Sequence, residues 1–212
     1  MMAHTHETAS KGNLVRWSKR YDAIFGHLLS GSEDRVIELA EIKTGATVLD
    51  LGCGPGSLTL KAKAHVGKTG KVFGIDAAPE MIELARKKAA EKGVEVGFQV
   101  SYAQELPFAD ATFDVVISRL VFHHLPGDLK RQALNEIQRV LKPGGRCLVV
   151  DFDLPSLPVV GGFLKHLLGS HAMPQTDVRN YAVLMKQADY QEVECDSTGR
   201  LLLAYAKGIK AQ

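Results

Sequence analysis

The chain has 212 residues, of which 45% are hydrophobic and 24% are charged. This length favours a single domain with one sizeable core, and the charged fraction excludes a wholly disordered chain. The 26 Lys and Arg residues nearly balance the 24 Asp and Glu residues, so no strong positive charge argues for a nucleic-acid partner. The 3 cysteines form no CxxC pair, and no apolar run is long enough to span a membrane.

Residues 1–13 are polar and carry no apolar stretch of the signal-peptide type. Together with the unpaired cysteines, this predicts a cytoplasmic protein. Two candidate helices follow, at Leu14–Phe25 and about Ser32–Ile42, and we assign residues 1–44 to an N-terminal helical lid. His4 and His6 alternate in the polar tail, which is a weak basis for a metal site, so we predict no bound metal.

From residue 46 onward, apolar β-branched runs alternate with segments of helical period. The predicted strands are Ala46–Leu51, Lys71–Asp76, Val94–Val100, Phe113–Ser118 and Cys147–Phe152. The predicted helices are Ser57–Val66, Pro79–Lys92 and Leu129–Leu141, the last of which ends at the Lys-Pro-Gly-Gly segment 142–145. Strands separated by helices of this length predict a parallel sheet that is covered on both faces.

The chain changes character after Asp153, where an irregular apolar stretch precedes a predicted helix at about Asp177–Ala188. Two strands, Gln191–Cys195 and Leu201–Ala206, then flank a turn at 197–199 and predict an antiparallel hairpin. The predicted fold is therefore α/β: a Rossmann-like, doubly wound, mainly parallel seven-stranded sheet with a C-terminal hairpin and N-terminal helices. Within one domain, we divide the chain into the lid, a core at 45–153, an insertion at 154–175 and a terminal part at 176–212.

The most informative segment runs from a strand into Gly52-x-Gly54-x-Gly56 and then into a helix. Glycines at such a turn let the backbone approach a ligand that a Cβ atom would block. Asp50 precedes the first glycine, and its carboxylate is suited to bind an ammonium group. Asp76 ends the next strand, where doubly wound folds place an acid for ribose hydroxyls.

The glycine spacing does not suit a pyrophosphate. The dinucleotide fingerprint is G-x-G-x-x-G, whereas here the third glycine comes one residue early. A carboxylate at Asp50 would also repel pyrophosphate. A cationic nucleoside that carries an amino acid fits better, and this argues against an NAD-dependent oxidoreductase.

At this point the sequence resembles the class I S-adenosylmethionine-dependent methyltransferases, and within them the small-molecule type of the ubiquinone/menaquinone C-methyltransferase family. The resemblance runs from Tyr21 to the end of the chain and is strongest from Val48 to Asp151. Its motifs occur in order: VLDLGCGPG, VFGIDAAPEMIELARKKA, ELPFADATFDVVIS and EIQRVLKPGGRCLVVDF. The resemblance implies S-adenosyl-L-methionine as the cofactor, with S-adenosyl-L-homocysteine as its product.

The resemblance also implies a set of cofactor contacts. The glycine loop would pass under the methionine part, Asp50 would face the amino group, and Asp76 would bind the ribose hydroxyls. The implied cofactor-binding residues are Tyr21, Asp50, Gly52, Cys53, Gly54, Gly56, Asp76, Ala77, Met81, Ala103, Gln104, Ser118 and Arg119. The chain departs from the family at Tyr102, where relatives often carry Asp or Asn for the adenine amino group.

Methyl transfer from a sulfonium is an in-line displacement, so the protein chiefly aligns the reactants and excludes water. A base is required only where the nucleophile must lose a proton. His123 and His124 follow the fourth strand of the alternation and are the candidate catalytic residues. A structural role, in which one of them fixes the loop, remains the alternative.

The acceptor itself is not specified by the sequence. The apolar insertion at 154–175 favours a small lipophilic or aromatic molecule if it roofs the pocket, although it could equally pack on the core or contact a membrane peripherally. Other functions left open are a non-catalytic S-adenosylmethionine-binding subunit and a methyltransferase for a phospholipid headgroup or a macromolecule. We expect a monomer or a homodimer.

Overall fold

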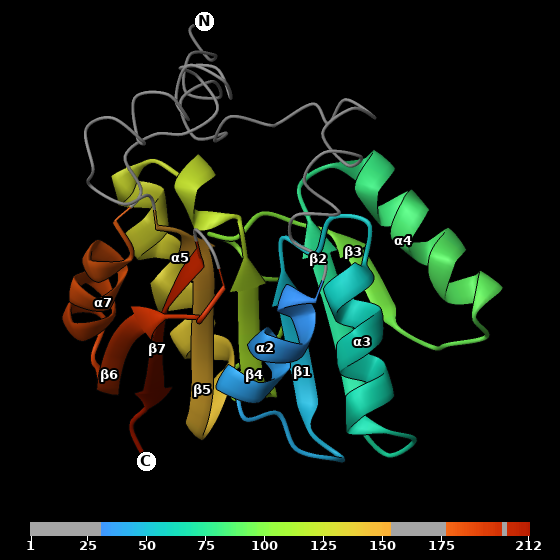
Figure 1. The fold of residues 1–212 in the computed structure, drawn as a ribbon, viewed down its shortest axis with the longest axis horizontal. Coiled ribbons are helices and arrows are strands. Elements are labelled where there is room, and N and C mark those ends of the chain that lie inside the picture. Colours follow the sequence, from blue (N-terminus) through green and yellow to red (C-terminus); the bar gives the residue numbers. More distant parts are fainter. Residues whose placement is uncertain (1–30, 154–176, 201–202) are drawn as a thin grey trace, which may run out of the picture.

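The computed structural model describes residues 31–153, 177–200 and 203–212 (Figure 1). A single 7-stranded sheet has the order β3-β2-β1-β4-β5-β7-β6. Its strands are β1 (Thr47–Leu51), β2 (Lys71–Asp76), β3 (Gly97–Val100), β4 (Phe113–Arg119), β5 (Leu141–Phe152), β6 (Tyr190–Ser197) and β7 (Leu203–Lys210). Strands β1 to β5 pair in parallel, whereas β7 runs antiparallel to both β5 and β6. The predicted fold class and its C-terminal hairpin are confirmed.

Helices flank the sheet on both faces (Figure 1). They are α2 (Ser32–Leu39), α3 (Ser57–Val66), α4 (Pro79–Glu91), α5 (Gly127–Val140) and α7 (Val178–Gln187), with a 3-10 turn η1 at Phe122–His124. Pro79 occupies the first turn of α4, where its missing N–H costs nothing. In α5 the buried residues Leu129, Ala133, Leu134, Ile137 and Val140 recur at helical spacing and form the face that packs on the sheet.

Alternation along β1 divides the core into two layers. Val48 packs with residues of α2 and α3, whereas Leu49 and Leu51 pack with residues of α5 and α7 on the opposite face. All three side chains are buried. Since successive strand residues point to opposite faces, Asp50 is directed toward the α3 layer. The sheet therefore places this carboxylate beneath the helix that follows the glycine loop.

Three strands differ clearly from the sequence-based bounds, one of which is β7, which continues past the predicted end at Ala206 to Lys210. Strand β3 begins at Gly97, three residues later than expected, because Val94 N–H still bonds to Ala89 O at the end of α4. Strand β5 begins at Leu141, before the Lys-Pro-Gly-Gly segment, which bulges out between the pairs Phe113–Leu141 and Val115–Arg146. The predicted helix at Leu14–Phe25, the lid residue Tyr21 and the insertion at 154–175 lie outside the described residues.

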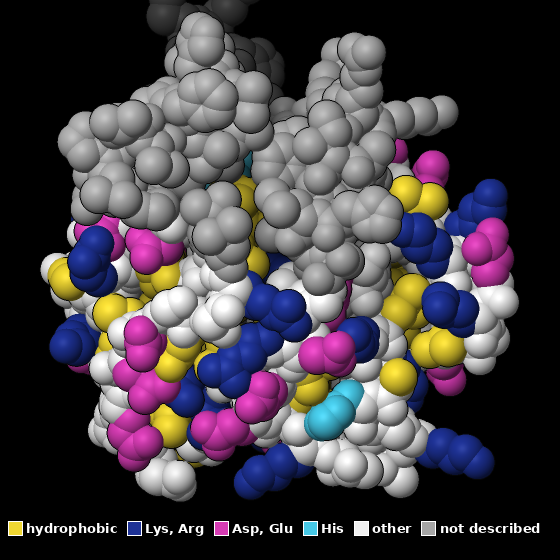
Figure 2. All heavy atoms as spheres, viewed as in Figure 1, with side chains coloured by type: hydrophobic (Ala, Val, Ile, Leu, Met, Phe, Trp, Pro, Cys, Tyr) yellow, Lys and Arg dark blue, Asp and Glu magenta, His cyan; other side chains and the backbone are white. Residues whose placement is uncertain are grey.

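The surface carries both charges. On the face that Figure 2 shows, Lys and Arg side chains lie interspersed with Asp and Glu side chains over the described residues. None of the helices within the described ranges combines the length and the apolar character needed to cross a bilayer.

Candidate active site

The carboxyl ends of the parallel strands meet at one edge of the sheet (Figure 1). Asp50 lies near the end of β1, Asp76 ends β2, Arg119 ends β4, and Asp151 lies near the end of β5. Ligands of open α/β sheets bind outside this edge. The topology thus brings together charged residues that are up to a hundred positions apart in the chain.

Asp76 ties the glycine loop to strand β2. Its Oδ2 accepts a hydrogen bond from Gly54 N–H at 2.9 Å, and its Oδ1 accepts one from Ala78 N–H at 2.9 Å. Burial raises the pKa of the Asp76 carboxyl above its ordinary value, and these two backbone bonds oppose the rise. A carboxylate has about four lone-pair sites, so these backbone bonds leave capacity for a further donor.

Asp50 is 1% exposed, and its Oδ2 accepts a short hydrogen bond of 2.6 Å from Thr59 Oγ1 on α3. Burial raises the pKa of this carboxyl to about 6, although the Thr59 bond and the charge of Arg119 lower it. The negative charge of Asp76 adds to the rise. The buried carboxylate of Asp50 and the half-buried carboxylate of Asp76 lie at neighbouring strand ends. They form an electronegative position, which favours a cation over a pyrophosphate.

The three glycines of the loop have different surroundings. Gly52 (φ +73°) and Gly56 (φ +80°) are hemmed in by protein: a Cβ at Gly52 would overlap the Val121 side chain, and one at Gly56 would lie 3.0 Å from Ala85 Cβ. Gly54 (φ +50°) faces open space, because a Cβ there would meet nothing within 4 Å. Gly54 is therefore the point where the backbone can be approached closely.

Cys53 is buried in a small apolar cluster with Ile82, Ala85, Ala89 and Phe98, so it packs the loop against α4. Burial and the charges of Asp50 and Asp76 raise the pKa of its thiol. A thiol in this state is a poor nucleophile. Two further predicted contacts, Ala77 and Met81, are half-buried where β2 leads into α4.

The loop after β3 carries Tyr102, Ala103 and Gln104, all half-buried. Ser101 N–H bonds to Asp76 O at 3.0 Å, which places the start of this loop beside the end of β2. Arg139 on α5 holds the far part of the loop, since its guanidinium donates to Leu106 O at 3.0 Å and to Phe108 O at 2.8 Å. Arg139 was absent from the sequence-based candidates, although this residue lies within the EIQRV motif.

Ser118 and Arg119 both use their side chains within the protein. Ser118 Oγ donates to Leu51 O at 3.0 Å, which links the ends of β4 and β1. Arg119 donates from Nη1 to Ser32 Oγ at 2.6 Å, and its Nη2 lies 3.3 Å from Glu33 Oε1. Arg119 thus anchors the start of α2 at the ligand-binding edge, while its charge acts on Asp50.

The two candidate histidines lie in η1, directly after β4. His123 is 4% exposed, and its Nδ1 lies 2.7 Å from Asp151 Oδ1. Asp151 Oδ2 also accepts from His123 N–H at 2.9 Å and from Tyr181 Oη at 3.1 Å. His124 is half-buried and stacks on His123 with ring centroids 3.7 Å apart. We refer to His123, His124, Asp151 and Tyr181 as the His123 cluster.

Asp151 and Tyr181 were absent from the sequence-based candidates. A signal for Asp151 did exist, because it is the charged residue that interrupts the buried apolar strand CLVVDF. Tyr181 carries no comparable signal, since an aromatic residue on the buried face of an amphipathic helix is explained by packing alone.

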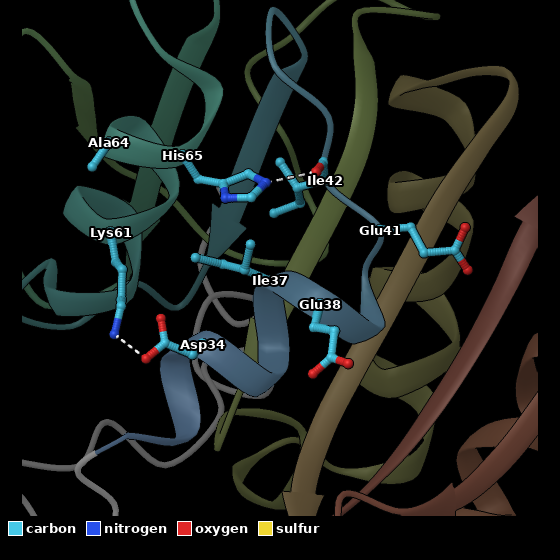
Figure 3. Close-up of a pocket in the computed structure, with 8 residues that line it drawn as sticks. All are labelled: Asp34, Ile37, Glu38, Glu41, Ile42, Lys61, Ala64 and His65. Carbon is cyan, nitrogen blue, oxygen red and sulfur yellow. Dashed lines mark hydrogen bonds and ion pairs between the residues drawn. The ribbon is translucent and has the colours of Figure 1, made fainter.

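A separate groove of about 580 Å³ lies between α2 and α3, away from this edge (Figure 3). Its apolar floor includes Ile37 and Ile42, and Lys61 and Asp34 form an ion pair of 2.6 Å at its rim. Its lining contains none of the predicted site residues.

Comparison with known proteins identifies the family. Residues 42–196 match the family described as "Methyltransferase domain". The chain belongs to this family of methyltransferases. It is 38% identical over 219 residues to the ubiquinone/menaquinone biosynthesis C-methyltransferase UbiE of Pseudomonas aeruginosa (strain LESB58), and the alignment covers 90% of this chain and 84% of that protein.

The methyltransferase is also 42% identical over 133 residues to the uncharacterized methyltransferase YcgJ of Bacillus subtilis. That alignment covers 62% of this chain and only 51% of YcgJ, so the chain spans about half the length of this relative. The crystal structure of YcgJ superposes with a TM-score of 0.68 at 25% identity, covering 85% of this chain and 98% of that one.

A methyltransferase from Aquifex aeolicus shares the fold, with a TM-score of 0.73 at 22% identity over 91% of this chain and 96% of that one. The family is the class I S-adenosylmethionine-dependent methyltransferases, so S-adenosylmethionine is the cosubstrate that membership implies. The buried acid Asp50 and the half-buried acid Asp76, beside the open backbone of Gly54, suit a ligand that carries an ammonium group and ribose hydroxyls.

Proposed function

We propose that the protein transfers the methyl group of S-adenosylmethionine to a small lipophilic or aromatic acceptor by in-line displacement. The observation that carries this proposal is the arrangement of Asp76, which accepts from the backbone of both Gly54 and Ala78 at the point where the glycine loop faces open space. This arrangement supports a nucleoside site, because ribose hydroxyls can donate to the remaining lone pairs of the carboxylate.

Asp50 would hold the ammonium group of the cosubstrate, and Gly54 would let the backbone pass under its methionine part. Ala77 and Met81 would flank the adenine, with Ala103 and Gln104 at its edge. When bound, the cosubstrate supplies a methyl group on a positively charged sulfur, which is already an activated leaving group. The chain's own task is then to orient both reactants and to exclude water.

Two observations support a small acceptor. Two relatives that align over about nine-tenths of the chain are named as C-methyltransferases of ubiquinone/menaquinone biosynthesis, and we infer that the acceptor of this chain is likewise a small lipophilic or aromatic molecule. The surface in Figure 2 mixes both charges rather than presenting a basic patch for a nucleic acid.

The cosubstrate site can be tested by calorimetric titration with S-adenosylhomocysteine and, separately, with NAD. We expect binding of the first and none of the second. Asp76→Ala should weaken binding about tenfold or more, since each charge-assisted hydrogen bond contributes about 1.5–3 kcal/mol. Glu83→Ala is the matched control, because Glu83 is an exposed acid of α4 that is not among the groups acting on the Asp76 carboxyl. Equal losses in both variants, or NAD binding alone, would contradict the proposal.

The acceptor class is tested by measuring S-adenosylhomocysteine release with phenols, quinols, amines, thiols and phospholipid headgroups. Turnover of a phenol or quinol supports the proposal. Turnover of headgroups alone would instead favour a phospholipid methyltransferase. Binding of S-adenosylhomocysteine without turnover of any probe would favour a non-catalytic subunit that supports a partner.

A further inference from the structure

His123 contains a buried nitrogen with no partner. Its Nε2 makes no hydrogen bond within the part of the chain that the structure describes, although the residue is only 4% exposed. Leaving a buried polar group unpaired is energetically costly, and such groups are uncommon in native proteins. By contrast, the other ring nitrogen and the backbone N–H of His123 both bond to Asp151. The unpaired Nε2 therefore requires an explanation.

Asp151 determines which nitrogen carries the proton. Four donors converge on its carboxylate, namely His123 Nδ1 and N, Tyr181 Oη, and Phe152 N. Burial and the charge of Asp151 raise the pKa of the Tyr181 hydroxyl, so Tyr181 remains a donor. An ionised carboxylate only accepts, so the shared proton lies on Nδ1 and Nε2 keeps its lone pair. Nε2 is therefore the basic atom of His123.

His124 differs from His123 in its burial and in its ring contacts. His124 is half-buried, and its ring lies tilted against that of His123, whereas the ring of His123 also bonds to the Asp151 carboxylate. Burial and the neighbouring His123 lower the pKa of His124 to about 4, which makes it a weak proton acceptor. The pair is therefore asymmetric, and the structure favours His123 over His124 as the group that receives a proton.

We propose that His123 Nε2 is the general base that accepts the hydroxyl proton of an aromatic acceptor during methyl transfer, and that Asp151 and Tyr181 are its positioning residues. This inference rests on the proposed function and names its substrate class: hydroxylated arenes that must lose a proton to become good nucleophiles. A base of this kind contributes about 10²–10⁴-fold to the rate.

The acceptor's O–H proton passes to Nε2, which leaves a phenolate whose electron pair is shared between the oxygen and the adjacent ring carbons. This electron pair forms the new bond to the methyl carbon. The bond from that carbon to sulfur breaks, and its electron pair neutralises the sulfonium. Where a ring carbon is methylated, its own hydrogen leaves as a proton and the oxygen regains one. In both cases one proton finally leaves His123 for water.

A pair of probes separates a base from a structural histidine. Catechol keeps its protons at neutral pH, whereas 4-nitrocatechol is already ionised in weakly alkaline buffer. His123→Gln should lower kcat for catechol by about 10²–10⁴-fold. It should lower kcat for 4-nitrocatechol far less, because the more acidic oxygen of that probe has already lost its proton and is a nucleophile without a base. KM and S-adenosylhomocysteine affinity should stay close to those of the wild type.

Three further variants complete the test. His65→Gln is the matched control, since His65 lies on α3 and bonds to Ile42 O, remote from the His123 cluster. Asp151→Asn should reproduce the catechol-selective loss. Because Asp151→Asn could impair folding, Tyr181→Phe is added: it removes one donor from Asp151 and should cost a few-fold in kcat on catechol alone. Melting temperatures and S-adenosylhomocysteine binding verify that each variant is folded.

The pH profile supplies an independent readout. With catechol, kcat/KM should rise with pH on the acidic side, and His123→Gln should remove that limb. The titratable groups that face His123 are Asp151 from β5, Tyr181 from α7 and His124 from η1, with Lys130 of α5 5.4 Å from the Tyr181 ring centre. His124→Gln should keep the limb, which assigns it to His123 rather than to its neighbour.

The outcomes distinguish this inference from the proposed function. Equal losses on catechol and 4-nitrocatechol in His123→Gln would make His123 structural, and the methyltransferase function would stand. Turnover of amines or thiols but of neither catechol would overturn the substrate class alone. Binding of S-adenosylhomocysteine with no turnover of any probe would overturn both.

Discussion

Asp50 and the His123 cluster lie at the same edge of the sheet. The two buried carboxylates there, Asp50 and Asp151, differ in how many hydrogen bonds they accept from the protein. Asp50 has a pKa raised to about 6, because its bond from Thr59 only partly offsets burial. Asp151 receives hydrogen bonds from four donors. The protein therefore compensates the charge of Asp50 only in part, whereas it surrounds the carboxylate of Asp151 with donors.

This contrast follows from what each position must do. A carboxylate that binds a cationic ligand is useful when its charge is poorly satisfied in the free protein, since the ligand then supplies the missing interaction. A carboxylate that orients an imidazole is useful when it is immobile, because a fixed acceptor fixes the tautomer. In the His123 cluster the carboxylate of Asp151 is satisfied, and the atom without a hydrogen bond among the described residues is His123 Nε2.

The largest expected effect concerns the packing of the glycine loop. Gly52→Ala should destabilise the fold, because its Cβ would overlap Val121 at a positive φ. Overpacking costs about 1–3 kcal/mol and the left-handed backbone a further ~1–2 kcal/mol. Gly54→Ala should cost only the backbone part, yet it should weaken S-adenosylhomocysteine binding because its Cβ enters the open space. Urea unfolding of the free protein measures the first difference and calorimetry the second.

Equal destabilisation by Gly52→Ala and Gly54→Ala would contradict the division of the loop into packed and open glycines. Normal S-adenosylhomocysteine affinity in a folded Gly54→Ala variant would show that the ligand does not approach the backbone there.

The next largest effect concerns Asp50. Asp50→Asn should weaken S-adenosylhomocysteine binding by about 10–100-fold, because a charge-assisted bond of about 1.5–3 kcal/mol is lost. Thr59→Val is the matched variant: it removes the hydroxyl that donates to Asp50 but leaves the carboxylate in place. Its loss of affinity should be smaller. If Thr59→Val were as damaging as Asp50→Asn, the position of the carboxylate rather than its charge would be decisive.

The same contrast explains what could be predicted from the sequence. Asp50, Gly54 and Asp76 fall within one strand-loop-helix-strand motif, where local spacing determines the geometry. Asp151 and Tyr181 acquire their role only because β5 lies next to β4 and α7 packs beneath it. Such neighbours depend on the whole topology. The acid within the apolar run CLVVDF could mark Asp151 as unusual, but it could not reveal the partners of Asp151, and no local pattern marked Tyr181.

Two other predicted residues show a related limit. Ser118 and Arg119 were placed correctly at the end of β4, but position does not reveal what a side chain bonds to. Ser118 links two strands, and Arg119 anchors α2 through Ser32 and Glu33. Their contacts with the cosubstrate stay a prediction. The bounds of β3 failed for a similar reason, since the C-terminal bonds of α4 hold Val94 out of the strand.

A third prediction concerns pH: titration of Asp50 should lower the stability of the fold and raise S-adenosylhomocysteine affinity as the pH rises. The pKa of this carboxyl rises from 3.8 to about 6 on folding, so the folded state binds the extra proton. The stability contributed by Asp50 is thus fully present below pH 3.8 and lost as the pH rises through 6. S-adenosylhomocysteine affinity should instead rise over the same window, because the ligand's ammonium group needs the carboxylate.

The measurement compares wild type and Asp50→Asn between about pH 3.5 and about pH 7, which spans the two pKa values of this carboxyl. The difference in free energy of unfolding between them should change by up to about 1.4 kcal/mol per pKa unit of the shift. The affinity difference should change in the opposite sense. A slope that persists in Asp50→Asn belongs to other titrating groups, among them Asp76, whose pKa burial raises, and His124, whose pKa burial lowers. Parallel slopes in stability and affinity would be inconsistent with an uncompensated acid at Asp50.

The smallest expected effect comes from a region that belongs to neither half of the site. Lys61→Ala removes the ion pair with Asp34 at the rim of the groove between α2 and α3 (Figure 3). Asp34 is largely exposed, so the pair should contribute only about 0–1 kcal/mol to stability and less at high salt. S-adenosylhomocysteine affinity and the catechol to 4-nitrocatechol ratio should be unchanged. A change in either quantity would mean that the groove is coupled to the carboxyl ends of the strands. The most direct physical connection would be α2, because Arg119 at the end of β4 bonds to Ser32 and pairs with Glu33 in the first turn of that helix.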